Sequence, residues 1–416
     1  MSLDKRVSRY HQLLNKYKGL IIVNPLMTGG KLPDNVAEKL LEEGWLEVGY
    51  SLCYDCIEGR SDTLGFPPVK SFLHDVAEFF GGETAEHTFG CRAAQFAVFK
   101  AISMKAEEGG FAKVAVVDSL CHYTTVVAAE LCGVSLVEVP NTGYPEFKVQ
   151  VEKYAEKIEE VKSKFGKPPA LVVLTHVDPY YGNLANAEEV GRIAESYGIP
   201  FMVNAAYTAG VMPVNMKAMK ANFLTISAHK SMASLAPLGF LVIRGYSGDV
   251  LKSVSTALEW SKRSFPNKMV NLFGCSIGGL PLISAMHAFP YVVERVKKWH
   301  EELEKVRWFI EEMEKIDGIK QLGEKPHNHH LTHFETPILW EISKRHKRKG
   351  FFLAEELEKR GIIGVQRGLT KHIKISVYGL SWDEIKRVRD VFYEIIDRYT
   401  REFNIRDVGV EVKERG

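Results

Sequence analysis

The sequence predicts an α/β fold, with a mostly parallel sheet covered by helices on both faces, followed by a smaller α+β domain. Between about residues 68 and 245, continuous apolar runs alternate with amphipathic segments, as in parallel sheets that are buried on both faces. After about residue 315 this alternation stops. We therefore expect an N-terminal arm (1–35), a large domain (36–285), and a linking helix with a small domain (286–416).

The elements of the large domain follow from local patterns. Helical spacing of apolar residues indicates helices at 69–80, 92–105, 123–131, 151–164 and 187–197. Short apolar runs indicate strands at 86–89, 113–117, 135–139, 170–175, 200–204, 222–226 and 238–243. Sites in such sheets lie at the carboxyl ends of the strands, and the motifs from Gly90 to Lys230 follow predicted strands.

Different elements are expected beyond the large domain. Residues 283–315 are predicted to form one long helix that bridges the two domains. The segments 319–323, 331–335 and 373–377 are strand-like, and 351–359 and 382–398 are helical. This mixture is typical of an α+β domain.

Composition and charge are those of an ordinary globular protein. The 416 residues are 45% hydrophobic and 25% charged, with a formal net charge of +2, so any nucleic-acid contact must come from local patches. We find no apolar signal-peptide core and no membrane span, and expect a soluble cytoplasmic protein. Six cysteines in a chain of this length indicate thiol chemistry or metal binding rather than a disulfide framework.

The most informative motif is Ser227-Ala228-His229-Lys230, which stands between two apolar runs. A lysine in a walled pocket loses solvation, which lowers the pKa of its amine. The free amine can then form a Schiff base with an aldehyde cofactor, and Ser227 and His229 can donate hydrogen bonds to a phosphate. We therefore expect pyridoxal phosphate (PLP) at Lys230, contacted by all four residues.

Three further positions complete the expected cofactor site. Gly90-Cys91-Arg92 opens a helix, where backbone N–H groups favour an anion and Arg92 adds a charged donor, although an ordinary helix start would look the same. His122 opens the next helix and is assigned to catalysis, because its ring could stack on a pyridine; a structural role is the alternative. Asn204 ends a strand, where its side chain could meet the pyridine nitrogen. Cys91, Arg92 and Asn204 are thus assigned to the cofactor.

The order of these residues resembles fold-type I PLP enzymes of the cysteine desulfurase branch, with two departures. Asn204 stands where most of that branch has Asp, and no cysteine follows Cys275, whereas desulfurases carry a persulfide cysteine late in the chain. Both features resemble the archaeal O-phosphoseryl-tRNA:cysteinyl-tRNA synthase family over nearly the whole chain. The matching motifs are Asn-Pro-Leu-Met-Thr-Gly-Gly (24–30), Cys-Tyr-Asp-Cys (53–56), Ala-His-Lys-Ser-Met-Ala (228–233), Leu-Phe-Gly-Cys (272–275), Pro-His-Asn-His (326–329), and Gly-Leu-Thr-Lys (368–371) with Tyr-Gly-Leu (378–380).

The resemblance implies conversion of O-phosphoseryl-tRNA(Cys) to cysteinyl-tRNA(Cys) by phosphate elimination and sulfur addition. It implies a homodimer, with a phosphoseryl-tRNA synthetase and a sulfur donor as partners. It makes Cys53, Cys56 and Cys275 active-site residues that carry persulfide or ligate an iron–sulfur cluster. The Gly-rich loop around Cys275 commonly reaches the partner's active site in fold-type I dimers, so we expect the three thiols to meet across the dimer. Arg60 and Arg92 are candidate ligands of the substrate phosphate, with Arg92 favoured for the cofactor.

Several sequence features fit two interpretations. The basic segments 344–349 and 262–268 fit tRNA phosphates or a solvated surface. Lys374 stands where relatives that act on free amino acids clamp the α-carboxylate with Arg, and an ester substrate needs no such clamp. The histidines at 327, 329 and 330 are interpreted as packing residues rather than metal ligands, and the side chains of Cys91, Cys121 and Cys132 as small packing groups.

Two other functions compete with the one that the resemblance implies. A cysteine desulfurase or lyase acting on a free amino acid would use the same cofactor, but Asn204 and the lack of a late cysteine argue against it. A non-catalytic scaffold for a tRNA complex is the alternative of another class. The presence of Lys230 and His122 argues against a scaffold.

Overall fold

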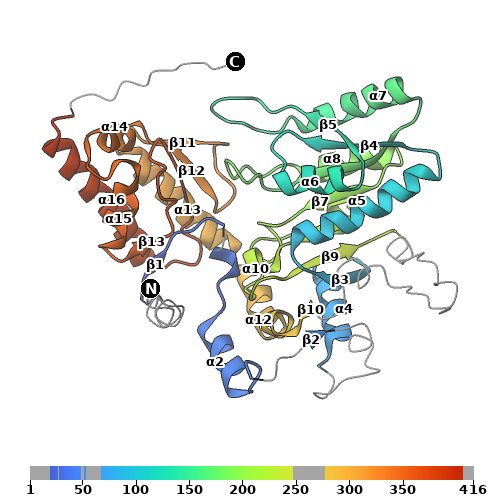
Figure 1. Cartoon of the computed structure of the whole chain (residues 1–416), viewed down its shortest axis with the longest axis horizontal. Helices are drawn as coiled ribbons and strands as arrows, with labels where there is room; N and C mark the ends of the chain where they lie inside the picture. Colours follow the sequence, from blue (N-terminus) through green and yellow to red (C-terminus); the bar gives the residue numbers. More distant parts are fainter. Residues whose placement is uncertain (1–18, 27, 48–50, 53–66, 247–276, 406–416) are drawn as a thin grey trace, which may run out of the picture.

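The computed structural model describes residues 19–26, 28–47, 51–52, 67–246 and 277–405 (Figure 1). Four of the predicted site residues, Cys53, Cys56, Arg60 and Cys275, lie outside the described residues, as does the basic segment 262–268. Within the described ranges, no helix combines the length and the apolar character needed to cross a membrane.

A seven-stranded sheet forms the centre of the large domain. Its strands lie in the order β3 (Thr84–Thr88), β9 (Gly239–Ile243), β8 (Phe223–Ile226), β7 (Phe201–Asn204), β6 (Pro169–Thr175), β4 (Ala112–Asp118) and β5 (Ser135–Val139). β9 runs antiparallel to both of its neighbours, and the other pairs are parallel. The predicted mostly parallel sheet is confirmed, and the carboxyl ends of every strand except β9 share one edge.

Helices cover both faces of this sheet (Figure 1). The helices are α4 (Val69–Phe79), α5 (Cys91–Glu107), α6 (Tyr123–Leu131), α7 (Tyr154–Phe165) and α8 (Ala187–Ser196). Side chains alternate along β4: Val114 and Val116 pack in the cluster that contains α4, α7 and α8, while Ala115 and Val117 pack with α5 and α6. This alternation buries both faces, which explains the continuous apolar runs in the sequence.

The bridge between the domains is two helices rather than the predicted single one. α12 (Gly279–Lys297) and α13 (Trp299–Glu314) are separated at Lys298, whose backbone angles are φ −96° and ψ 14°. The two helices serve different cores: Leu282 of α12 packs in the large domain, and Phe309 of α13 in the small one. After the break, Trp299 still packs in the large-domain cluster, and α13 turns its later apolar residues to the small-domain core.

The small domain is built on a three-stranded antiparallel sheet. β12 (Thr332–Glu335) lies between β11 (Lys320–Leu322) and β14 (His372–Ile375). The covering helices, seen at the left of Figure 1, are α13, α14 (Pro337–Arg345), α15 (Phe352–Glu358) and α16 (Trp382–Glu402). Ser381 and Glu384 form a capping box that begins α16. The expected strands and two helices are present, and α14 is an addition.

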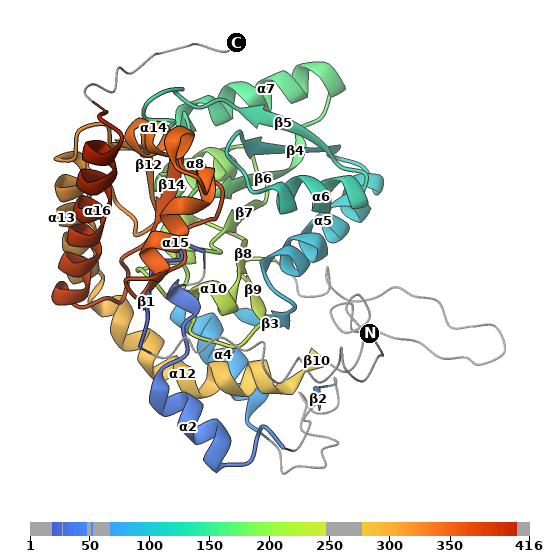
Figure 2. The same ribbon diagram turned by 60° about the vertical axis from the view of Figure 1, so that its left-hand side comes forward.

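The N-terminal segment belongs partly to the small domain. β1 (Ile21–Ile22) pairs in parallel with β13 (Ile362–Ile363), and Val23 is fully buried in the small-domain core. α2 (Asp34–Glu42) then packs on α12 (Figure 2). Residues expected to form an arm therefore connect both domains.

Short elements complete the described chain. They are η2 (Thr28–Gly30), η3 (Val151–Lys153), α9 (Met216–Met219), α10 (Ala228–Ser231), η5 (Lys349–Phe351), and the antiparallel pair β2 (Ser51–Leu52) and β10 (Ile277–Gly278). In this pair Leu52 faces Ile277 and Ser51 faces Gly278. Segments more than 200 positions apart thus meet within one chain.

Candidate functional site

A cavity of about 280 Å³ opens at the edge where the parallel strands end. It lies where α5 follows β3, α6 follows β4 and α10 follows β8. The predicted cofactor residues that line it are Cys91, Arg92, His122, Asn204, Ser227, His229 and Lys230. Ala228 is the described exception, because its side chain is fully buried in the hydrophobic core.

Lys230 presents its amine inside this cavity. Its Nζ donates to Tyr207 Oη at 3.4 Å and lies 4.8 Å from the centre of that ring. Burial lowers the pKa of the Lys230 amine, and the Arg92 guanidinium lowers it further, although Cys91 acts in the opposite direction. The free-base form, which is the nucleophile, is therefore more accessible than for an exposed lysine.

The start of α5 forms a seat for an anion. Gly90 precedes the helix at φ 108°, and a Cβ added there would lie 3.0 Å from His229 Cε1. Gly239 of β9 passes so close that its own Cβ would meet Gly90 Cα at 2.5 Å. The first helical bond runs from Ala94 N–H to Gly90 C=O, so the earlier amides of this 17-residue helix can receive an anion.

Ser227 and His229 stand beside this seat. Ser227 Oγ lies 3.3 Å from His229 Nε2, and His229 Nδ1 lies 2.7 Å from the carbonyl oxygen of Leu238. Burial lowers the pKa of the His229 imidazole. Nδ1 thus fixes the His229 ring. Nε2 and the Ser227 hydroxyl both face the cavity, where the predicted contact with a phosphate requires them.

His122 is held as a neutral ring. It precedes α6, and its Nδ1 accepts a hydrogen bond of 3.3 Å from Thr124 N–H. Burial is the main cause that lowers the pKa of His122 to about 4, and the charges of Lys230, Arg92 and Lys374 add to it. At neutral pH the imidazole is therefore uncharged, which suits stacking on an aromatic ring.

Asn204 is oriented by its neighbours. Its Oδ1 accepts hydrogen bonds from Ala206 N–H at 3.1 Å and from Cys91 Sγ at 3.2 Å. With the oxygen committed, the amide nitrogen is the donor that Asn204 can offer to a ligand. Burial raises the pKa of the Cys91 thiol, which agrees with the expected packing role of that side chain.

Arg92 lies at the solvent-exposed mouth of the cavity. The exposed side chain donates to Tyr123 Oη at 2.5 Å, and its guanidinium carbon lies 5.2 Å from the centre of the Tyr123 ring. None of the residues that line the described cavity is an Asp or Glu. The mouth therefore favours an anionic ligand.

Comparisons with known proteins agree with this geometry. The family model described as O-phosphoseryl-tRNA(Sec) selenium transferase matches residues 76–397. O-phospho-L-seryl-tRNA:Cys-tRNA synthase 2 of Archaeoglobus fulgidus is 48% identical over 94% of this chain and 98% of its own length. The O-phospho-L-seryl-tRNA:Cys-tRNA synthase of Methanopyrus kandleri is 46% identical over 96% and 99%.

This chain belongs to the O-phospho-L-seryl-tRNA:Cys-tRNA synthase family. The crystal structure of a SepCysS–SepCysE N-terminal domain complex matches with a TM-score of 0.82 and 43% identity, over 96% of this chain and all of that one. A cysteine desulfurase from Thermococcus onnurineus NA1 shares the fold at a TM-score of 0.68 and 18% identity, over 91% and 95%. The predicted family and fold are confirmed, as is a transferase of the PLP-dependent fold family.

The donor set of this synthase-family site fits PLP. An aldehyde needs the amine of Lys230, and a phosphate needs the amide seat at Gly90 with Ser227 and His229. The neutral His122 would hold the pyridine ring, and the Asn204 amide would donate to its nitrogen. Each of these groups lines the same cavity, so the residues present match the aldehyde, the phosphate and the pyridine nitrogen of the cofactor.

Two residues of the site were missed in the sequence. Tyr207 follows Asn204 by three positions, and its hydroxyl contacts Lys230; the Asn-Ala-Ala-Tyr motif was noted without a role for its tyrosine. Arg295 of α12 donates hydrogen bonds to the carbonyl oxygens of Gly29 (2.8 Å), Gly210 (2.7 Å) and Ser231 (2.5 Å). Nothing in the local pattern of α12 signals this role, because it depends on three distant segments.

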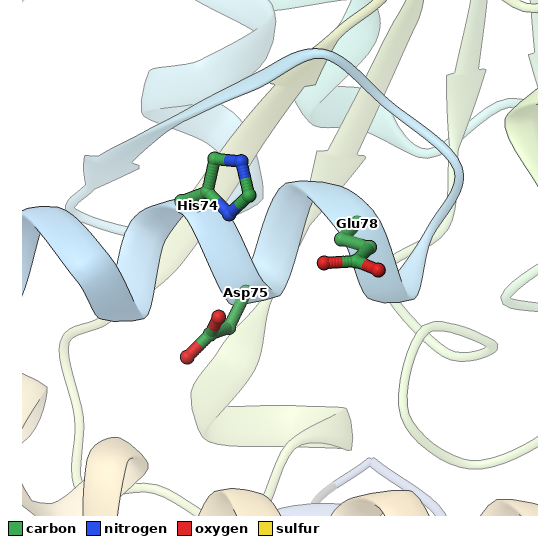
Figure 3. Close-up of side chains that lie close together, drawn as sticks. All are labelled: His74, Asp75 and Glu78. Carbon is green, nitrogen blue, oxygen red and sulfur yellow. The ribbon is translucent and has the colours of Figure 1, made fainter.

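The predicted cysteine ligands Cys53, Cys56 and Cys275 lie outside the described residues. His327, His329 and His330 are buried and bond to Leu331 O, Tyr207 O and Ser376 Oγ, in agreement with a packing role. Among described residues, the one group with metal-like spacing is His74, Asp75 and Glu78 on α4 (Figure 3). All three are exposed, so they resemble an ordinary solvated helix face.

Proposed function

We propose that this protein converts O-phosphoseryl-tRNA(Cys) into cysteinyl-tRNA(Cys), by eliminating phosphate and adding sulfur with PLP as cofactor. The observation that carries the proposal is the buried amine of Lys230 beside an anion seat, in a chain 48% identical to an archaeal synthase of this name. We extend the proposal to a cytoplasmic homodimer that works with a phosphoseryl-tRNA synthetase and a sulfur donor.

Lys230 supplies both the attachment and the proton transfer. When bound, PLP withdraws electrons from the substrate's α-carbon. The Lys230 amine, with its lowered pKa, can take the α-proton and later return it to the same carbon. The substrate's carboxyl group is an ester, so its α-proton is more acidic than that of a free amino acid. A neutral donor such as Asn204, in place of Asp, is compatible with this lower demand.

Arg92 and Tyr123 are our candidates for the departing phosphate. Both side chains stand at the mouth, and Arg92 is joined to a hydroxyl rather than to a carboxylate. A guanidinium can bind phosphate through two parallel N–H bonds and stabilise the leaving charge. Sequence reasoning assigned Arg92 to the cofactor, and its position at the mouth favours the substrate. Arg60, outside the described residues, remains a second candidate.

Sulfur is proposed to reach the substrate through Cys53, Cys56 and Cys275, either through an iron–sulfur cluster or as a persulfide. The outer sulfur of a persulfide would bond to the β-carbon as a mixed disulfide, and a neighbouring cysteine thiol would break it, leaving a Cys–Cys disulfide that an external thiol reduces. Cys53 directly follows β2, and Cys275 stands two positions before β10. β2 and β10 pair within one chain, and the three cysteines themselves lie outside the described residues. We keep the expectation that the three thiols meet across the homodimer.

Lys374 supports an ester substrate over a free amino acid. Its Nζ donates to Pro179 C=O at 2.8 Å, and Pro179 lines the cavity. Burial lowers the pKa of the Lys374 amine. A single ammonium that is tied to a backbone carbonyl makes a poor bidentate clamp for a carboxylate, so this position favours the tRNA ester over the desulfurase alternative.

The test is a conversion assay with purified protein, PLP, phosphoseryl-tRNA(Cys) and sulfide. Phosphoseryl-tRNA and hydrogen sulfide should give cysteinyl-tRNA and hydrogen phosphate in equal amounts, which is a redox-neutral exchange. Replacing sulfide with selenide, and tRNA(Cys) with tRNA(Sec), tests the activity named by the family model. No phosphate release from phosphoseryl-tRNA, together with turnover of free cysteine, would support the desulfurase reading instead, and no cofactor binding would support the scaffold.

A further inference from the structure

A row of aromatic rings leads away from the cavity wall. It starts at Tyr180, next to the lining residue Pro179, and passes through Tyr181 and Phe147 to Tyr144. Successive ring centres lie 6.5, 4.0 and 6.2 Å apart, and the rings of Tyr181 and Phe147 stack at an angle of 3°. Tyr180 is 43% exposed and Tyr144 47%, while the two middle rings are half-buried supports.

A lysine of the small-domain sheet lies over each of the two exposed rings. Lys374 Nζ of β14 lies 5.4 Å from the centre of the Tyr180 ring, and Lys320 Nζ of β11 lies 4.9 Å from that of Tyr144. Lys374 also bonds to Pro179 C=O, which fixes the first lysine at the cavity wall. The surface therefore alternates aromatic faces with positive charge.

The outer end of the row is held in place by polar contacts. Tyr144 Oη donates a hydrogen bond of 3.1 Å to Glu335 of β12, and Lys320 Nζ lies 3.3 Å from the same hydroxyl. These contacts occupy the polar tip of the ring and leave the ring available for stacking. A fixed, half-exposed ring next to a cation has little side-chain entropy to lose when a ligand stacks on it.

We propose that these four rings with Lys320 and Lys374, which we call the aromatic row, bind the unpaired 3′ nucleotides of the substrate tRNA through the exposed rings of Tyr144 and Tyr180. This rests on the proposed function, because the phosphoseryl group is attached to the 3′-terminal nucleotide. When that group reaches Lys230, the preceding nucleotides must lie directly outside the cavity. Aromatic faces with basic side chains are the features that bind unstacked bases and their phosphates, whatever the sequence.

The test compares full-length tRNA(Cys) with tRNA(Cys) that lacks its unpaired 3′ nucleotides. Wild-type protein should bind the truncated tRNA more weakly. A Tyr144→Ala/Tyr180→Ala variant should bind full-length tRNA at least about fivefold more weakly than wild type, because each lost stacking contact weakens binding. The variant should then show little further loss with truncated tRNA. Filter binding gives the four affinities, and the visible absorption of bound cofactor reports that the cavity is intact.

Phe165→Ala is the matched control. Phe165 is also exposed, at 46%, and has Lys164 Nζ 5.4 Å from its ring centre, but it lies before β6, at the opposite edge of the sheet. Phe165→Ala should leave the affinities for full-length and truncated tRNA(Cys) unchanged. Equal loss on truncation in wild type and in the tyrosine variant would overturn the aromatic row. If wild-type protein binds neither tRNA nor PLP, the proposed function itself fails.

Discussion

The Arg295 guanidinium donates a hydrogen bond of 2.5 Å to the carbonyl oxygen of Ser231, the residue that follows Lys230. Its other bonds reach Gly29 and Gly210. One side chain of α12 thus joins three backbone segments around the lysine-bearing turn. Arg295 acts through the backbone and touches no part of the proposed cofactor, so it is a positioning residue.

Arg295→Lys should weaken PLP binding about tenfold, because a lysine ammonium cannot reproduce the planar fork of donors, and a charged hydrogen bond contributes about 1.5–3 kcal/mol. Equilibrium dialysis with absorbance detection measures the affinity, and thermal unfolding reports stability. Arg398→Lys on the exposed face of α16 is the matched control and should change neither. An unchanged PLP affinity in Arg295→Lys would show that the turn holds its shape without this side chain.

Lys230→Ala should remove covalent PLP attachment and turnover, and leave the fold intact. The side chain lines a cavity and makes one long hydrogen bond of 3.4 Å, so little packing depends on it. Borohydride reduction followed by mass measurement should add cofactor mass to the wild-type protein alone. Undiminished conversion by the variant would remove the central claim.

Asn204→Asp should keep PLP bound and change the visible spectrum. A carboxylate can still accept from Ala206 N–H, as Asn204 Oδ1 does at 3.1 Å, and its second oxygen would favour a protonated pyridine nitrogen. Absorbance titrations of the two proteins from pH 6 to pH 9 provide the measurement. Superimposable spectra would mean that residue 204 does not face the ring.

Cys53→Ala, Cys56→Ala and Cys275→Ala should each reduce cysteinyl-tRNA formation sharply and spare PLP binding. Cys132→Ala is the control: this thiol is buried, and burial raises its pKa. Because the three thiols are proposed to meet across the dimer, mixing a Cys53→Ala/Cys56→Ala protein with a Cys275→Ala protein should restore part of the activity. No recovery in confirmed heterodimers would assign the three thiols to one subunit.

A second mixture asks which cavity the sulfur site serves. Heterodimers of Lys230→Ala with Cys53→Ala/Cys56→Ala carry the intact thiols and the intact lysine on different subunits. Activity is expected if the thiols serve the partner's cavity. An inactive mixture, with heterodimers verified by mass, would assign the thiols and Lys230 to the same subunit.

Acid should destabilise the fold between about pH 6.5 and pH 4. Burial lowers the pKa of His87, His122, His176, His327 and His333 to about 4 and that of His330 to about 3. The unfolded chain therefore binds more protons than the folded one in this window, and stability falls as the pH falls. Asp118 works in the opposite direction, because burial raises its pKa to about 7, but the histidines outnumber it.

The unfolding free energy as a function of pH measures this effect. His330→Asn should lower the slope between pH 6.5 and pH 4 by about one proton, or 1.4 kcal/mol per pH unit. His74→Asn, on the exposed face of α4, should leave the slope unchanged. If the unfolding free energy of the wild-type protein does not change over this range, the buried histidines bind protons as readily in the folded protein as in the unfolded chain.

Local patterns predicted much of this fold. The β4 and β6 runs are visible because both faces of the sheet are buried, and His122, Asn204 and Lys230 could be placed because they follow such runs. The break at Lys298 could not be predicted, since both helices are amphipathic and only the existence of two cores separates them. Arg295 and the aromatic row were equally hidden, because their contacts join residues that are distant in sequence.

The pairing of β1 with β13 sets an order for folding during synthesis. The large domain lies between these strands in the chain, so its sheet can form on the ribosome while β1 still has no partner. Val23 and its neighbours must wait until β13 and the helices around it emerge. The β1 segment, although it is synthesised before the whole of the large domain, is therefore among the last to be buried.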